Sequence, residues 1–148
     1  EADSLIIAGM GGNLVIHILE NGKETVKDMK QCILQPQSEI QKVRKYLREN
    51  DFKIIEEKMV FEDGKYYPMM KAVPSSNISK NENKLYDRFG EYLLETKNPV
   101  LEKYLKHQLI KNEQILKGLF EYADSQKIRI SELTEDRNLI MQALDYWK

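Results

Sequence analysis

Two short segments of this chain combine residue types that could bind a ligand where a β-strand ends. The first consists of Gly9, Met10, Gly11 and Gly12 and follows the apolar run at residues 5–8. Glycines let the backbone approach a ligand closely, and the amino terminus of a following helix favours polar or anionic groups. The spacing matches neither the G-x-G-x-x-G of dinucleotide-binding turns nor a phosphate-binding loop. A tight turn with close helix packing is the alternative interpretation.

The second segment consists of Gln35, Pro36 and Gln37 and ends the apolar run at residues 32–34. Ligands of open α/β sheets bind at the carboxyl edge of the strands, where both segments are expected to lie. An amide side chain donates and accepts hydrogen bonds at once, so it can read the edge of a nucleobase. Tyr66 is a third candidate, because its ring can stack on a base. Plain strand-end polarity for the glutamines and a half-buried sheet position for Tyr66 are the alternatives.

The composition argues against several other kinds of site. The chain has two histidines and one cysteine, so no metal site is expected and no catalytic residue is assigned. Cys32 lies within an apolar run and is predicted to be a buried, reduced thiol. A net charge of −1 gives no bulk electrostatic preference for nucleic acid, and 41% apolar residues allow a globular core. No run approaches the ~20 apolar residues of a membrane span and no signal peptide is recognised, which predicts a cytoplasmic protein.

The elements that must position the two segments alternate along the first half of the chain. Apolar runs and helical periodicity predict strands at 3–8, 31–35, 52–61 and 66–73, and helices at 13–20 and 39–49. Ser38 and Gln41 match a capping box, and Asp63-Gly64 is a hairpin turn signal. Helical crossovers make the first three strands parallel, and the hairpin adds a reversed strand at the end of the sheet. Pro68 in that strand favours an edge position or a bulge. The predicted fold class is α/β.

The second half of the chain is predicted to be helical. The predicted regions are an α/β domain at 1–76, a polar linker at 77–83 and an all-α domain at 84–148. Asn98-Pro99 marks the start of a long helix that runs to about Ala123, with Asn as the cap and Pro at the first helical position. Ser131 is predicted to cap a last helix. Two long helices joined by a short turn predict an antiparallel helical hairpin.

The long helix has two contrasting faces when its residues are rotated by ~100° each. One face is apolar and carries Leu101, Leu105, Leu109, Leu116, Leu119 and Phe120. The opposite face is basic and carries Lys103, Lys106, His107, Lys111 and Lys117. The basic face is either an ordinary solvated surface or a contact for a phosphate backbone.

Four stretches together resemble a known family. They are "DSLIIAGMGG", "ILQPQ", "EDGKYYPMMKAVP" and "FGEYLLETKNPVLEKYL". In this order they resemble the bacterial tRNA (adenine(22)-N1)-methyltransferase family, TrmK, and the resemblance covers essentially the whole chain. It implies a Rossmann-like domain that uses S-adenosyl-L-methionine, followed by a helical coiled-coil domain. Gln37 stands where the family tends to have Asn, a change that keeps an amide.

The resemblance implies that a methyl group is transferred to N1 of adenine 22 in tRNA. The segments at 9–12 and 35–37, with Tyr66, would then shape the pocket for cofactor and base, and the basic face would hold the tRNA. A methyltransferase for another nucleobase or a small molecule, and a non-enzymatic RNA or protein interaction module, are the alternatives.

The resemblance also implies that this chain is the carboxyl-terminal portion of the family's fold. The first strands and the glycine-rich loop of the methyltransferase domain would precede Glu1. By itself the chain is therefore expected to be inactive and to bind the cofactor weakly or not at all. The strand at 5–8 would then be exposed as an edge, so the chain is expected to self-associate or to be completed by the missing half.

Overall fold

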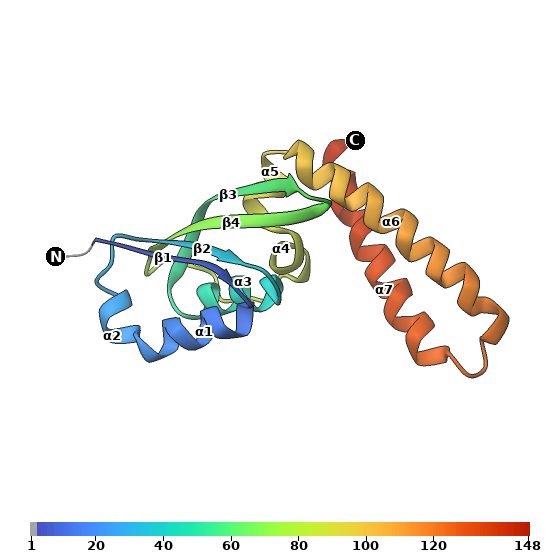
Figure 1. Ribbon diagram of the computed structural model, residues 1–148, viewed down its shortest axis with the longest axis horizontal. Coiled ribbons are helices and arrows are strands. Elements are labelled where there is room, and N and C mark those ends of the chain that lie inside the picture. The colour runs from blue at the N-terminus through green and yellow to red at the C-terminus, as the bar shows by residue number, and fades with distance from the viewer. Residues whose placement is uncertain (1–2) are drawn as a thin grey trace. The chain divides into compact units, whose positions relative to one another are not determined.

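The computed structural model describes residues 3–148, which divide into two compact units. The first unit ends at Thr96 and contains a four-stranded sheet with the strand order β1-β2-β4-β3 (Figure 1). The second unit, Lys97–Lys148, is helical. The chain is therefore a mixed α/β protein with carboxyl-terminal helices, as the sequence predicts.

Strands β1 (Ser4–Met10) and β2 (Gln31–Pro36) pair in parallel across a crossover made by α1 (Gly12–Asn21) and a short helix α2 (Lys23–Val26). The sequence does not predict α2. The core lies where α1 and α3 (Ile40–Glu49) cover one face of the sheet (Figure 1). Its side chains are apolar and come from every one of these layers: Ile7, Val15, Leu19, Leu34, Val43, Leu47, Met70 and Ala72 are all buried. β1 and β3 are the edge strands of the described sheet.

The hairpin of β3 (Phe52–Glu62) and β4 (Lys65–Pro74) turns at Asp63-Gly64, where both residues have positive φ, as predicted. The predicted place of the reversed strand is wrong, however. β4 lies inside the sheet, antiparallel to both β2 and β3, and β3 forms the edge. The reason is the difference in polarity between the two strands, since charged side chains such as Lys53, Glu56 and Lys58 protect an exposed edge.

Pro68 lies in the part of β4 that pairs with β3 alone, because the pairing with β2 is limited to Met70, Lys71 and Ala72. No strand pairs with β4 at Pro68 on the side away from β3, so an inner strand tolerates a proline at this position as an edge strand would.

The capping box predicted at Ser38 does not form. The residue before α3 is Glu39, in the left-handed conformation with φ 52°, and no side chain caps this helix. The Ser38 carbonyl oxygen instead accepts a hydrogen bond from the backbone N–H of Gly12 at 2.8 Å. A hydrogen bond between the loop after β1 and the loop after β2 thus takes the place of the cap predicted within the second loop.

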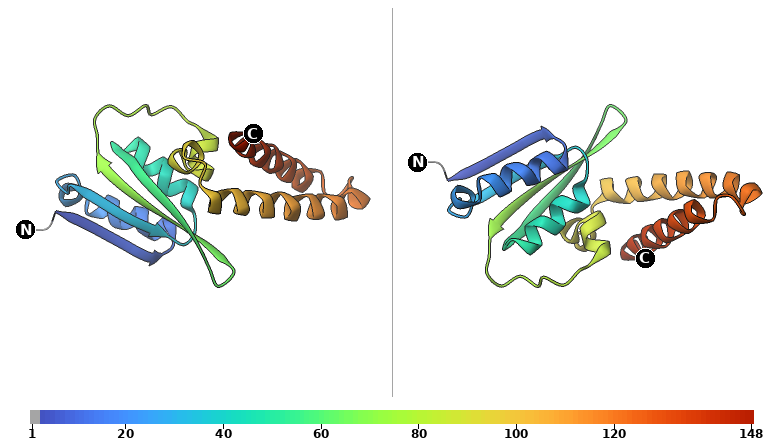
Figure 2. Two further views of the ribbon diagram at one scale, coloured as in Figure 1. Left: turned by 90° about the horizontal axis from the view of Figure 1, so that it is seen from above. Right: turned by 90° about the horizontal axis from the view of Figure 1, so that it is seen from below.

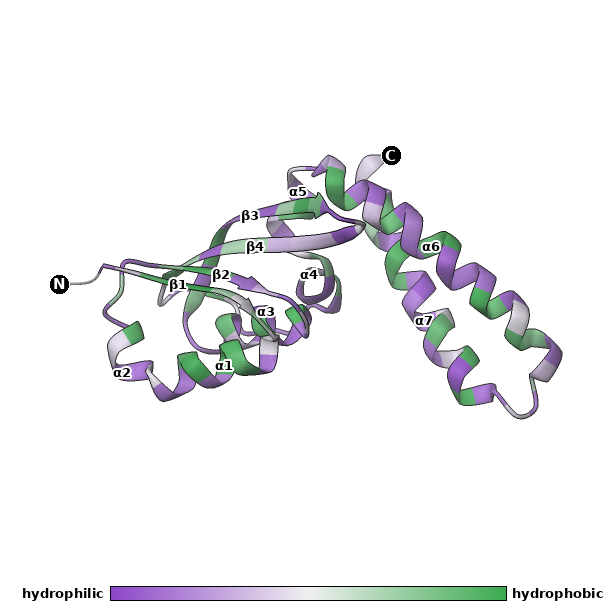
Figure 3. Ribbon diagram, viewed as in Figure 1, coloured by the Kyte–Doolittle hydropathy of each residue, from purple (hydrophilic) through white to green (hydrophobic). Residues whose placement is uncertain are grey.

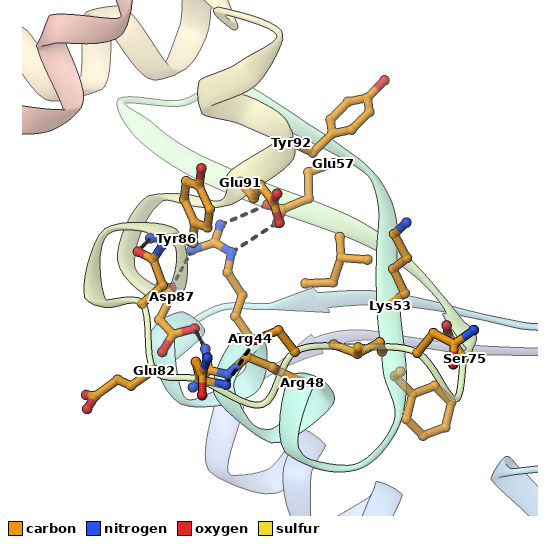
Figure 4. A pocket seen from close by; sticks show the side chains of 17 residues that line it. Arg44, Arg48, Lys53, Glu57, Ser75, Glu82, Tyr86, Asp87, Glu91 and Tyr92 are labelled. Atoms are coloured by element: carbon orange, nitrogen blue, oxygen red, sulfur yellow. Dashed lines mark hydrogen bonds and ion pairs between the residues drawn. The ribbon is translucent and has the colours of Figure 1, made fainter.

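A buried ionic network joins α3, β3 and the two short helices α4 (Lys84–Phe89) and α5 (Glu91–Glu95). Arg44 donates two hydrogen bonds to the Glu57 carboxylate, at 3.1 and 2.9 Å (Figure 4). It donates two more to the backbone carbonyls of Asp87 and Arg88. Arg48 pairs with the Asp87 carboxylate. The network holds α4 within the first compact unit.

Gly90, between α4 and α5, belongs to the "FGEYLL" stretch and has φ +88°. A Cβ atom there would lie 2.8 Å from Glu57 Oε2, so both its conformation and its surroundings require glycine. The two compact units divide between Thr96 and Lys97, later in the chain than the expected start of the helical domain at residue 84. The bonds from Arg44 to α4 account for this difference.

The second unit is an antiparallel hairpin of α6 (Pro99–Leu119) and α7 (Lys127–Leu144). The Asn98 side chain accepts hydrogen bonds from the backbone of Val100 and Leu101, which confirms the predicted cap. The predicted cap at Ser131 is wrong, because α7 already begins at Lys127. Apolar and polar residues alternate along both helices (Figure 3).

Two residues do not fit a simple division of α6 into an apolar and a basic face. Asn112 is buried on the apolar side, where its amide donates a hydrogen bond to the Leu133 carbonyl at 3.1 Å. A single buried amide of this kind fixes the register of a helical pair. Phe120, predicted on the apolar face, is 60% exposed because α6 gives way to a 3-10 turn at Phe120–Tyr122.

Candidate functional site

The two segments predicted to form a site are joined at the carboxyl edge of β1 and β2. The backbone N–H of Gly12 donates to the Ser38 carbonyl at 2.8 Å, and the backbone N–H of Gln37 donates to the Met10 carbonyl at 2.9 Å. These bonds cross-link the loop after β1 to the loop after β2. The parallel pairing of the strands makes this possible, because it brings both carboxyl ends to one edge.

The glycines of the first segment have two different roles. At Gly12 a Cβ atom would lie 2.3 Å from the Ser38 carbonyl oxygen, so this glycine allows the two loops to pack closely. Gly9 has φ +73° and interrupts the regular pairing of β1 with β2, yet nothing lies within 4 Å of its Cβ position. The close-packing interpretation therefore accounts for Gly12, whereas the surroundings of Gly9 are open.

The second segment presents side chains that differ in exposure. Gln37 is exposed and Gln35 is half-buried, whereas Pro36 is fully buried and acts in packing. The segment thus offers two amides beside an open glycine backbone, with the partly exposed Met10 next to them. Such a site can hydrogen-bond a planar, neutral group, but it supplies no carboxylate or imidazole for proton transfer.

Tyr66 lies on a part of the β3–β4 hairpin that projects past this edge. β4 pairs with β2 only through Met70, Lys71 and Ala72, so the residues from 65 to 69 extend beyond that pairing on β3 alone. Figure 2 shows the hairpin (green) reaching past the ends of β1 and β2 (blue). Tyr66 contacts Phe61, with ring centroids 4.7 Å apart. Phe61 was not predicted, although its place opposite Tyr66 across a hairpin turn is a readable signal.

A pocket of about 520 Å³ lies elsewhere in the first unit and contains none of the predicted site residues. It is lined by α3, β3, α4 and the segment from Ser75 to Asn83, and the network of Arg44 and Glu57 forms part of its wall (Figure 4). Arg44 is bonded to Glu57 and Arg48 to Asp87, so we interpret this part of the wall as structural.

Cys32 is buried in β2, which confirms the sequence interpretation, and burial raises the pKa of its thiol. It is therefore held as a neutral thiol, away from the exposed edge. Within residues 3–148 no group of three or more His, Cys, Asp or Glu side chains could hold a metal ion. None of the helices described is both long and apolar enough to cross a membrane.

The basic face of α6 is exposed along its whole length in the second unit. Its members are Lys103, Lys106, His107, Lys111 and Lys117. Lys106 pairs with Glu102 at 2.8 Å, and Ile110 lies exposed among these side chains. The face is thus available to a phosphate backbone, and whether it binds one stays a prediction.

Comparison with known proteins decides between the families that such a fold allows. The family model described as TrmK, tRNA (adenine(22)-N(1))-methyltransferase, matches residues 1–141. The chain belongs to this family. The resemblance read from the sequence is thereby confirmed.

Among TrmK relatives, the tRNA (adenine(22)-N(1))-methyltransferase of Bacillus subtilis is 31% identical over 99% of this chain. A protein of the NADB-Rossmann superfamily from Streptococcus agalactiae is 27% identical and superposes with a TM-score of 0.83 over 96% of the chain. A Streptococcus pneumoniae protein solved in complex with S-adenosyl-L-methionine is 25% identical, with a TM-score of 0.80 over 96% of the chain.

The chain spans 63% of the length of the Bacillus subtilis relative and 60% of each of these two solved chains. It therefore covers less than two thirds of the length of these relatives.

Proposed function

We propose that this chain is the carboxyl-terminal portion of an enzyme that methylates N1 of adenine 22 in tRNA. The family match over residues 1–141 supports the reaction. The observation that carries the site is the pair of backbone hydrogen bonds that joins the loop at 9–12 to the loop at 35–38. These bonds hold an open glycine backbone and two amides at one edge of the sheet.

The cofactor would supply a methyl group on a sulfonium, which N1 of the adenine attacks in line. The residues of this chain fit a role on the side of the base. Gly9 leaves space at its Cβ position, and Gln35 and Gln37 offer donors and acceptors for the edge or exocyclic amine of an adenine. N1 lies on the Watson–Crick edge, so the base must be unpaired or extruded before it can react. The contribution of these residues is positioning, since the site holds no proton-transfer group.

The reaction can be tested with the complete protein that contains this chain, S-adenosyl-L-methionine and two unmodified tRNA transcripts. One transcript carries adenine at position 22 and the other carries guanine there. Mass spectrometry of the digested tRNA is expected to show N1-methyladenosine only from the first transcript. Methylation of both transcripts would indicate another target base. Stoichiometric binding of tRNA without transfer would indicate an interaction module.

The basic face of α6 is the proposed contact for the tRNA backbone. Replacing Lys103, Lys106 and Lys111 together by Gln is expected to weaken tRNA binding. The dependence of log K on log salt should flatten by up to ~0.9 for each phosphate contact that is lost. Filter binding across a series of salt concentrations measures both quantities.

A matched control removes the same number of charges elsewhere. Lys27, Lys42 and Lys45 are exposed in the first unit, where each pairs with a neighbouring glutamate. Replacing these three by Gln is expected to change the salt dependence much less. Equal effects of the two triple variants would mean that the face of α6 is only solvated surface.

A further inference from the structure

The tip of the β3–β4 hairpin carries an aromatic pair of which only Tyr66 is predicted from the sequence as a site residue. Phe61 and Tyr66 are directly opposite each other in the hairpin register, with ring centroids 4.7 Å apart and ring planes tilted by 40°. Tyr66 is half-buried, whereas Phe61 is 56% exposed. One ring therefore supports the other and leaves an aromatic surface open to solvent.

The register places this pair beyond the edge of the sheet that carries the candidate site. Leu34 of β2 pairs with Met70 of β4, and Tyr66 lies four residues before Met70. At ~3.3 Å per residue the ring pair stands about 13 Å beyond that pairing, in the direction in which β2 continues into Gln35 and Gln37. β4 is the neighbour of β2 as far as Leu34, so the hairpin continues past the same edge of the sheet at which β2 ends in the two amides.

The chemistry of the tip favours a nucleobase over a phosphate. The turn next to Phe61 carries two exposed carboxylates, Glu62 and Asp63, against one exposed lysine, Lys65, so its net charge does not favour a phosphate backbone. A neutral aromatic surface has no such conflict with the face of a base, and every base has a face that can stack on it.

We propose that Phe61, supported by Tyr66, is a stacking platform for a nucleotide next to the target adenine. An adenine extruded into the site must leave its neighbours in the strand, and the platform replaces part of the stacking that these neighbours lose. This inference rests on the proposed function, because it takes tRNA as the substrate. It adds a contact that neither the loops at the sheet edge nor the basic face of α6 supplies.

The first test is the affinity of the complete protein for tRNA. Phe61→Ala and Phe61→Leu are expected to weaken binding about tenfold, within the range that base–ring stacking contributes, whereas Phe61→Tyr keeps the ring and the affinity. The loss should appear in KM for tRNA, with kcat nearly unchanged at saturating tRNA. The slope of log K against log salt should stay constant, since no phosphate contact is lost.

A matched control is Val60→Ala. Val60 is the preceding residue of the same strand and points to the opposite face of the hairpin, where it is 39% exposed. The Val60→Ala variant removes exposed apolar surface without removing a ring. It is expected to leave the affinity for tRNA unchanged.

A readout independent of activity uses tRNA that carries 2-aminopurine at position 21 or 23. Stacking on Phe61 is expected to quench its fluorescence at one of these positions, and Phe61→Leu should abolish the quenching. Wild-type affinity for both Phe61→Ala and Phe61→Leu would overturn the inference. So would the dissociation of a self-associated protein by Phe61→Ala without any change in tRNA affinity. If the wild-type protein does not methylate adenine 22, the proposed function fails instead.

Discussion

Replacing Arg44 with methionine is expected to lower the free energy of unfolding of the chain by about 3–5 kcal/mol, the range found when one partner of a buried ion pair is removed. The Glu57 side chain is only 1% exposed, so the variant leaves a buried carboxylate without its partner. The backbone carbonyls of Asp87 and Arg88 lose their donor as well. Urea unfolding followed by circular dichroism measures the change.

Lys45→Met is the matched control, since Lys45 lies on the same helix and pairs with Glu49 at 4.0 Å on an exposed surface. Loss of this exposed ion pair is expected to lower the free energy of unfolding by less than 1 kcal/mol. The double variant Arg44→Met/Glu57→Met removes both buried charges and should recover part of the stability, which keeps the test informative if the single variant does not fold. Equal stabilities of Arg44→Met and Lys45→Met would contradict a buried, bidentate pair.

Two features whose signals are local were predicted from the sequence. Asp63-Gly64 specifies a turn with positive φ, and Asn98-Pro99 specifies a helix start, because the residues that make each signal are adjacent in the chain. The position of β4 between β2 and β3 is not local. The charges on β3 are the signal for an edge strand, and they outweigh the expectation that a terminal hairpin adds its last strand at the edge.

The candidate site was predicted in part for the same reason. That the loops at 9–12 and 35–37 lie together follows from the parallel pairing of β1 and β2. The role of Gly12 could not be predicted in this way, because it depends on the path of the backbone through Ser38 and Glu39. The capping-box pattern predicted a different contact there. The network of Arg44, Glu57 and Gly90 was not predicted, since these residues belong to three elements and no periodic pattern connects them.

Among glycine-to-alanine substitutions in the site, Gly12→Ala is expected to lower the activity most. The new Cβ atom would lie 2.3 Å from the Ser38 carbonyl oxygen and 2.8 Å from that of Glu39. Both atoms belong to the backbone and cannot rotate away, so the loops at 9–12 and 35–38 must separate. A displacement of about 1 Å in a positioning site costs on the order of 10²-fold in rate. We expect a loss of this size in kcat/KM for tRNA methylation by the complete protein.

The neighbouring glycine provides the control for this variant. A Cβ atom on Gly11 would meet Ser38 Oγ at 3.0 Å, and that hydroxyl can turn to another rotamer. Gly11 also has φ −62° and ψ 150°, a conformation that alanine adopts without strain. Gly11→Ala is therefore expected to keep most of the activity, and a thermal melt of each variant separates a displaced loop from a failure to fold. If Gly12→Ala and Gly11→Ala retain equal activity, the hydrogen bond between Gly12 and Ser38 does not organise the site.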